Sequence, residues 1–193
     1  MRPRIYLTAL ALLVMMSSPR AAFGQNPRAS VSATYTFLRD TDLDASFGRG
    51  VSLGGAYRLH HGVFVTAEFA LSGRHQDFLS SQGGTYDFWY ESLQAGPRLA
   101  PLQGRVQPYV EVLVGATRLG IWERRLDQTG EWGAWEFSLQ PGLGVDIPVR
   151  GRLALRFAGD LRLVSTRDTR FDEDYRRRLY RLNVGVAFHL GGS

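Results

Sequence analysis

The chain has 193 residues but no cysteine, no lysine and only four histidines. Without cysteine it can form no disulfide framework, no thiolate metal site and no lipid anchor on a cysteine. All 23 basic residues are therefore arginine, which we interpret as codon bias of the genome rather than selection for phosphate contacts. The length fits one domain, and no cluster of proline or glycine marks a linker.

The sequence also lacks an apolar run of the roughly 20 residues that a transmembrane helix needs. Its most apolar stretch, residues 5–16, follows Arg2 and Arg4 and precedes a polar segment that ends in the small residue Gly24. This order of basic, apolar and small-residue segments is typical of a secretory signal peptide. An uncleaved membrane anchor is the alternative.

We therefore predict a signal peptide over residues 1–24 and a mature domain over residues 25–193. The predicted signal peptide carries three arginines and no acid, so the rest has 20 arginines against 18 acids. This near balance is no footprint of nucleic-acid binding, and we expect no nucleic-acid partner.

Eight segments of this domain alternate apolar and polar residues with a period of two, the pattern of a strand with one apolar face. In the last segment, Leu182 and Val184 alternate with Arg181 and Asn183. In lipid, only helices and closed β-barrels have all their backbone groups hydrogen-bonded, and no segment here is long and apolar enough for a helix. We therefore predict that residues 25–193 form an outer-membrane β-barrel domain with an all-β fold, an eight-stranded antiparallel up-and-down transmembrane β-barrel. The segments cover residues 30–37, 51–59, 63–72, 86–99, 106–117, 135–147, 153–163 and 179–190.

The segment at residues 86–99 is the least regular of the eight. Leu93 and Pro97 agree in phase as outward-facing residues, but Glu91 has the same parity and would also face outward. A β-bulge near Tyr90 would restore the phase.

The connections between the segments alternate in length. All long connections would lie at one end of the barrel, as in outer-membrane barrels with short periplasmic turns and longer external loops. A soluble periplasmic barrel of the lipocalin type, the alternative, has no reason to sort its connections in this way. The long connections are residues 39–49, 73–85, 118–133 and 165–176, and the short ones are 60–62, 100–105 and 149–152.

Residues 28–190 resemble the OmpA/OmpX type of small outer-membrane barrel, within the outer membrane protein β-barrel domain family. The resemblance is carried by three internal stretches and by the last segment. The internal stretches are Gly-Pro-Arg at residues 96–98, Pro-Tyr at 108–109 and Gly-Leu-Gly-Val-Asp at 142–146. The resemblance implies a location in the bacterial outer membrane.

The last segment matches the family's C-terminal assembly signal, in which a polar residue, a glycine, an aromatic residue and an apolar or aromatic residue recur at fixed spacing. Asn183, Gly185, Phe188 and Leu190 occupy these positions. The match implies recognition by the outer-membrane assembly machinery. The chain departs from the pattern because Leu190 replaces the usual terminal aromatic residue and three residues follow it.

Several charged residues have the polar parity and would face the barrel interior. An eight-stranded barrel is only wide enough for side chains, and buried charges are tolerated when they are paired. We therefore expect a plugged lumen in which Glu68 and Glu111 pair with arginines, chiefly Arg156, Arg162 or Arg181, and Asp160 joins the network. A narrow gated channel, the alternative, would favour a ring of charges of one sign. The predicted lumenal charge network is Glu68, Glu111, Arg156, Asp160, Arg162 and Arg181.

The sequence offers no catalytic constellation of a known barrel enzyme. Outer-membrane lipid deacylases carry a histidine two residues before a serine on a late strand, and none of His60, His61, His75 and His189 has this spacing. We expect no catalytic residue, metal or cofactor, and a non-enzymatic structural, adhesive or surface-contact role. A lipid-modifying barrel enzyme is the alternative.

The expected partners are the outer-membrane lipid and the assembly machinery, and we expect a monomer. Arginines at the bases of the external loops, such as Arg176 and Arg178, add glycolipid phosphates as candidate ligands, because guanidinium groups suit phosphate geometry.

Overall fold

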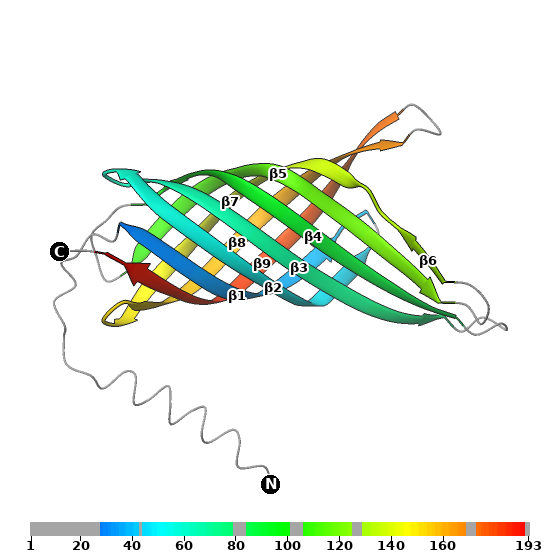
Figure 1. The fold of residues 1–193 in the computed structure, drawn as a ribbon, viewed down its shortest axis with the longest axis horizontal. Coiled ribbons are helices and arrows are strands. Elements are labelled where there is room, and N and C mark those ends of the chain that lie inside the picture. Colours follow the sequence, from blue (N-terminus) through cyan, green and yellow to red (C-terminus); the bar gives the residue numbers. More distant parts are fainter. Residues whose placement is uncertain are drawn as a thin grey trace, which may run out of the picture.

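A computed structural model describes residues 28–42, 44–78, 84–100, 106–124, 129–168 and 173–191. The predicted signal peptide lies outside these residues. The described part holds nine strands (Figure 1) and no helix long and apolar enough to cross a membrane. The strands are β1 (Ala29–Asp40), β2 (Ala45–His60), β3 (Val63–Phe78), β4 (Gly84–Leu99), β5 (Gln107–Arg124), β6 (Thr129–Trp132), β7 (Trp135–Arg150), β8 (Leu153–Asp168) and β9 (Glu173–Leu190).

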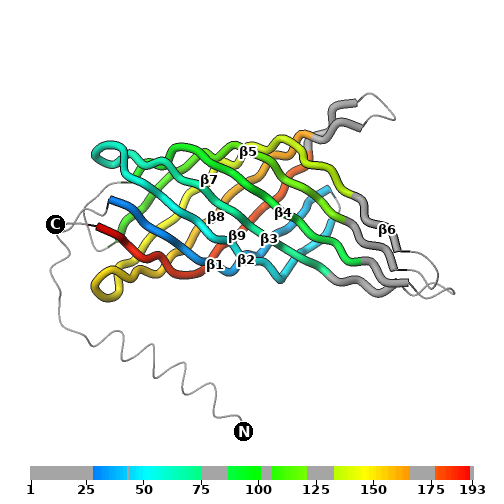
Figure 2. The backbone as a smooth tube through the Cα atoms, in the orientation of Figure 1, coloured from blue at the N-terminus to red at the C-terminus, as the bar shows by residue number. Residues whose placement is uncertain are grey.

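Eight of the nine strands close into a barrel. Neighbouring strands of the barrel wall pair antiparallel in chain order, with β6 left out, and the barrel closes where β1 pairs with β9. β5 pairs with β7 along the barrel wall, whereas the short β6 pairs only with the far end of β5. Figures 1 and 2 show the strongly tilted strands of this barrel. The predicted eight-stranded antiparallel barrel is confirmed, and β6 is a further strand that the alternation did not reveal.

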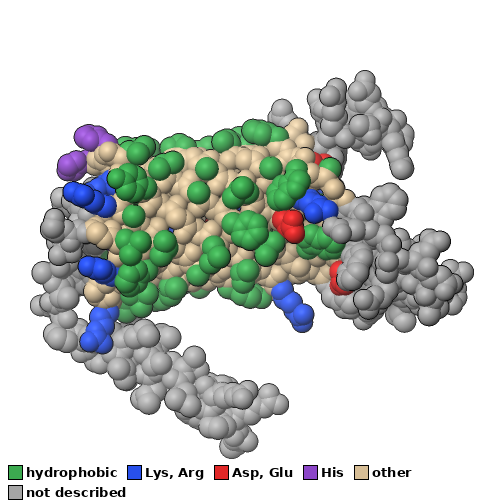
Figure 3. All heavy atoms as spheres, in the orientation of Figure 1, with side chains coloured by type: hydrophobic (Ala, Val, Ile, Leu, Met, Phe, Trp, Pro, Cys, Tyr) green, Lys and Arg blue, Asp and Glu red, His purple; other side chains and the backbone are tan. Residues whose placement is uncertain are grey.

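The exterior of the barrel is apolar, as the period-two pattern predicts. Leu53, Leu143 and Leu182 are each at least 60% exposed and belong to the apolar parity of their strands. Hydrophobic side chains cover the middle of the barrel in Figure 3, and the charged ones gather toward its two ends. The large apolar side chains therefore face the surroundings, where a soluble barrel would place polar ones.

Both chain ends of the barrel lie beside its short turns. Ala29 pairs with Leu190, next to the turns that join β2 to β3 and β7 to β8. Gly62 (φ 71°) and Gly151 (φ 55°) adopt the left-handed conformation in these turns, which other residues adopt only at a cost. Short turns mark the periplasmic end of an outer-membrane barrel.

The irregular phase of β4 has another cause than the expected bulge. β4 pairs with β3 in unbroken register from Leu99 to Gly84, so the predicted bulge near Tyr90 is absent and that expectation was wrong. Glu91 faces outward and lies 3.9 Å from Arg118, its direct cross-strand partner on β5. Both side chains are only about a quarter exposed (29% and 24%), so this ion pair explains how an acid fits on the outer face near the external end.

A register shift occurs instead in β2. Thr36 pairs with Gly50, but Leu38 pairs with Phe47, so β2 carries one extra residue. An extra residue inverts the side-chain parity beyond it. Phe47 therefore points into the lumen, where it is 1% exposed.

The strands extend beyond the predicted segments at the external end. β3 reaches Phe78 and β4 begins at Gly84, while β8 reaches Asp168 and β9 begins at Glu173. Much of the predicted long connections is therefore strand. Hydrogen bonds between strands continue above the membrane, but an apolar face is no longer needed there, so the alternating pattern ends before the strand does.

Candidate functional site

The lumen of the barrel is filled by three layers of side chains, which we name by position from the periplasmic end. The lower ionic layer consists of Arg98, Tyr109, Glu111, Asp146 and Arg156. The middle ionic layer consists of Glu68, Gln140, Asp160, Arg162, Arg181 and Asn183. The apolar layer, nearest the external end, consists of Leu38, Ala45, Phe47, Tyr90, Val164 and Leu179.

Two ion pairs and an aromatic ring form the lower ionic layer. Arg98 Nη2 lies 2.7 Å from Glu111 Oε2, and both side chains are less than a tenth exposed. Arg156 donates two hydrogen bonds of 2.7 Å to the two carboxylate oxygens of Asp146. The Tyr109 ring lies between the two guanidinium groups, 4.2 Å from that of Arg98 and 5.3 Å from that of Arg156. Each buried arginine thus has a carboxylate and an aromatic face.

A glycine on β7 makes room for this ring. A Cβ atom on Gly144 would lie 2.4 Å from Cζ of Tyr109, far inside van der Waals contact. Tyr109 and Gly144 are direct partners in the β5–β7 pair. The absence of a side chain at Gly144 therefore allows the tyrosine ring to pack against the backbone of β7.

Arg181 is the centre of the middle ionic layer. It donates from Nη2 to Glu68 Oε1 at 2.6 Å and from Nε to Asp160 Oδ1 at 2.8 Å. Asp160 also accepts a 3.0 Å hydrogen bond from Asn183. The Arg181 side chain is 1% exposed, so its charge is balanced by these acids and not by water.

Arg162 completes the same layer through a neutral side chain. It donates from Nε and Nη2 to Gln140 Oε1 at 3.0 and 2.7 Å, and Gln140 in turn donates to Glu68 at 3.3 Å. Arg162 Nη2 itself lies 3.8 Å from Glu68. Glu68 is therefore shared by two arginines.

The partner of Glu111 differs from the one expected from the sequence. Glu111 was expected to pair with Arg156, Arg162 or Arg181, and this was wrong: its partner is Arg98. The two residues face each other directly across the β4–β5 pair. Pro97 and Leu99 have the outward parity, which predicts that Arg98 between them faces the lumen. Because the phase of β4 was uncertain, Arg98 was not included in the predicted network.

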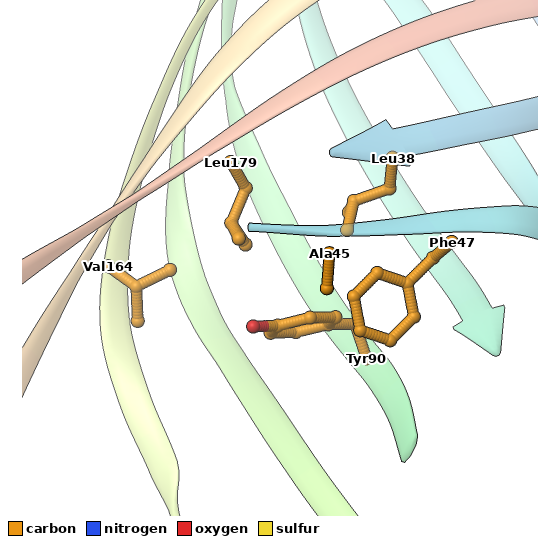
Figure 4. Packing of buried hydrophobic residues seen from close by; sticks show 6 residues of the cluster. All are labelled: Leu38, Ala45, Phe47, Tyr90, Val164 and Leu179. Atoms are coloured by element: carbon orange, nitrogen blue, oxygen red, sulfur yellow. The ribbon is translucent and has the colours of Figure 1, made fainter. Parts of the chain in front are cut away.

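The apolar layer was not anticipated, because Leu38, Tyr90 and Leu179 lie on the otherwise polar parity of their strands and Phe47 reaches the lumen only through the register shift in β2. Figure 4 shows the six side chains converging from several strands on the interior. The rings of Phe47 and Tyr90 meet edge to face, with centroids 5.1 Å apart. The Tyr90 hydroxyl donates a hydrogen bond to Asp40, whose carboxylate also lies 3.8 Å from Nε of Arg177. A water-excluding layer therefore lies between the ionic layers and the external end.

The residues of the predicted assembly signal lie on both faces of β9. Asn183 faces the lumen, where it accepts a 2.7 Å hydrogen bond from Thr36. Gly185 lies against β1, and a Cβ atom there would be 2.1 Å from the carbonyl oxygen of Ala33. Phe188 and Leu190 face outward and are about two-fifths exposed (42% and 39%).

The described residues hold no group of three or more histidines, cysteines or acids placed to bind a metal ion. The spacing Gly-x-Ser-x-Gly, known from serine hydrolases, occurs at residues 50–54. It lies within β2 and not on a strand-to-helix turn, and Ser52 is buried, 2.6 Å from the hydroxyl of Thr34. Ser52 is therefore part of the lumen packing rather than an exposed nucleophile.

A substitution in the lower ionic layer tests whether the lumen charges stabilise the barrel. Glu111→Gln keeps an acceptor oxygen but leaves the buried Arg98 without a counter-charge, so we expect about 1.5–3 kcal/mol lower free energy of unfolding. Urea titration of the protein folded into lipid vesicles measures it. As a control, Asp44→Asn removes the exposed ion pair with Arg39 and should cost less than about 1 kcal/mol. Higher single-channel conductance without loss of stability would show a gated conduit instead.

A closed eight-stranded antiparallel barrel with an apolar exterior, a charged interior and short turns at one end defines the class of small outer-membrane β-barrels. The chain belongs to the outer membrane protein beta-barrel domain family, whose model matches residues 8–192. Membership of this family places the protein in the bacterial outer membrane. No curated protein matches the chain.

Solved structures of small outer-membrane proteins share this fold. Neisserial surface protein A is 14% identical, with a TM-score of 0.62 over 84% of this chain and 96% of the other. OprG from Pseudomonas aeruginosa is 11% identical, with a TM-score of 0.54 over 85% and 96%. Ail, the attachment invasion locus protein of Yersinia pestis, is 18% identical, with a TM-score of 0.53 over 83% and 96%, and was crystallised with the heparin analogue sucrose octasulfate.

Proposed function

We propose that this protein is a non-enzymatic surface-contact protein that acts through strands projecting beyond the outer membrane. The observation that carries the proposal is the sheet formed by the external ends of β3, β4 and β5 together with β6. β3 and β4 remain paired as far as Phe78 and Gly84, and β4 and β5 as far as Thr85 and Arg124. Figure 1 shows this sheet extending past the barrel at the end away from the short turns.

The projecting sheet has two edges that no described strand covers. β2 stops pairing with β3 at Arg49 and Gly73, so the edge of β3 from Arg74 to Phe78 has no strand beside it within the described residues. β6 pairs with β5 on one side only among those residues. Uncovered edges present backbone donors and acceptors to which an extended segment of another protein can add as a strand. This favours a role in contact with extracellular proteins.

The interior of the barrel supports a plug rather than a channel. Its buried acids and arginines are paired with each other, and the apolar layer crosses the lumen above them. Apolar constrictions resist the passage of ions because water withdraws from them. A gated channel and a lipid-modifying enzyme remain the second and third candidates.

The proposed partners of the protein also include the glycolipid of the outer leaflet and the outer-membrane assembly machinery. The exterior arginines Arg39, Arg49 and Arg178 lie near the external interface, where they would meet phosphate groups of outer-leaflet glycolipid. The assembly machinery would recognise Phe188 and Leu190 before the barrel closes. The protein would act as a monomer, because its exterior is suited to lipid around the whole barrel.

Shortening the projections tests the contact role without opening the barrel. Gly73 faces Trp89, and Arg118 faces Trp135, so an Asn-Gly turn can replace residues 74–88 and another can replace residues 119–134. Bacteria that display this variant should adhere to epithelial cells no better than bacteria without the protein. Heat-modifiable gel mobility checks that the barrel is folded.

The hairpin of β8 and β9 provides a matched control. Ser165 faces Arg176, so the same turn can replace residues 166–175. This variant should keep its adhesion, because the sheet of β3 to β6 is intact. Full adhesion of the first variant, or equal loss in both, would contradict the proposed role of the projecting sheet.

A further inference from the structure

The outer face of the barrel carries an apolar groove of about 860 Å³. Its floor is Gly159, which has the outward parity of β8, between Phe157 and Leu161. A Cβ atom at Gly159 would meet only Leu182 at 3.6 Å and a backbone oxygen at 3.8 Å, so a larger side chain would fit. Glycine in the interior of a strand weakens it. A hollow kept at this position therefore has a stability cost that a bound molecule would explain.

One arginine lines the external end of this groove, and a second lies beside that end. Arg39 lines the groove and is paired across the β1–β9 ladder with Tyr180. Arg178 lies outside the lining of the groove, two residues along from Tyr180 on the same outward face. Its backbone carbonyl accepts a hydrogen bond from Thr41, and its backbone N–H donates to the Asp42 carboxylate at 2.8 Å. Diagonal neighbours of this kind lie about 7–8 Å apart, with their Cβ atoms somewhat closer, so long arginine side chains at the two positions are near enough to bind one phosphate together.

The contacts of Arg39 leave it available for such a ligand. Its guanidinium donates to Asp44 at 2.6 Å and to Ser46 at 3.0 Å. The Arg39 and Asp44 side chains are 56% and 87% exposed, and ion pairs this exposed are weak. A phosphate, with more acceptor oxygens and two arginines to bind, can replace Asp44 as the partner.

We propose that this face binds one molecule of phosphorylated, acylated glycolipid of the outer leaflet. A phosphate is held by Arg39 and Arg178, and an acyl chain lies along the groove over Gly159 between Leu161 and Leu182. The tyrosine ring of Tyr180 lies at the boundary between the two parts, the level at which amphipathic rings settle. The inference rests on the glycolipid partnership proposed above and gives it a location.

Binding of lipid A with two phosphates to the purified full-length protein tests the site, with native mass spectrometry to count bound lipids. We expect one tightly bound lipid A. The double variant Arg39→Gln/Arg178→Gln should bind it about tenfold or more weakly, because a charge-assisted contact is lost. Gly159→Leu should reduce binding similarly by filling the groove, and Gly159→Val serves if the leucine variant does not fold. Lipid A without phosphates should bind more weakly than the phosphorylated form.

The matched control is Gly55→Leu. Gly55 is an outward-facing glycine of β2, and a Cβ atom added there would have no neighbour within 4 Å. It should bind lipid A like the unchanged protein. Equal binding by the Gly159 and Gly55 variants, or by lipid A without phosphates, would overturn the proposal. Complete displacement by inorganic phosphate would also overturn it, because it would reveal a site for free anions. None of these outcomes bears on adhesion, which the shortened projections test separately.

Discussion

Replacing Arg181 by methionine is expected to lower the free energy of unfolding by about 3–5 kcal/mol. Arg181 bridges Glu68 at 2.6 Å and Asp160 at 2.8 Å in the middle ionic layer. Methionine fills much of the same volume but leaves two buried carboxylates without their shared cation. Urea titration of the protein folded into vesicles measures the change.

Two further variants show whether the loss comes from the charges. Arg39→Met makes the same substitution at an exposed ion pair and should change stability by less than about 1 kcal/mol. Adding Glu68→Gln and Asp160→Asn to Arg181→Met should restore part of the lost stability, because the unpaired charges are removed. A loss below about 1 kcal/mol for Arg181→Met would mean that water compensates the acids and that the lumen is wet.

Val112→Arg is expected to cost about 2–4 kcal/mol, the penalty for a cation near the middle of the bilayer. Val112 faces outward on β5, is 46% exposed and pairs with Pro141 on β7. Its position within the strand places it far from both interfaces. The same vesicle titration measures the loss.

The control lies on the same face at the periplasmic end. Val106 is 51% exposed, and Val106→Arg should cost at most about 1 kcal/mol, because an arginine near the interface reaches the headgroups. Equal losses at Val106 and Val112 would contradict the assigned position of β5 in the membrane.

The outward face of most barrel strands could be predicted from residues such as Val112 and Leu143; β4, with the outward Glu91, and the far end of β2 are the exceptions. Each outward side chain contacts lipid independently of the other strands, so the sequence of one strand is enough to predict which of its faces is apolar. Lumenal partners are harder to predict. Glu111 lies on the predicted polar face, but its pairing with Arg98 is set by the register between β4 and β5. The sequence of one strand alone does not specify that register.

The register shift in β2 illustrates the same limit. Leu38 and Leu179 interrupt a polar parity, and only the closed barrel shows that they meet Phe47 and Tyr90 in one layer. Phe47 reaches the lumen because β2 carries an extra residue opposite β1. No alternation along β2 alone indicates this inversion.

The sequence by itself determined the number of barrel strands, the face that most of them turn to lipid and the end at which the short turns lie. These properties depend on the local contrast between apolar and polar residues and on the chain length between strands. The tertiary structure decided which buried charges pair, where the lumen is apolar and how far the strands project from the membrane. Those features depend on register and closure, in which residues distant along the chain are placed face to face by hydrogen bonds that are nearly independent of side-chain identity.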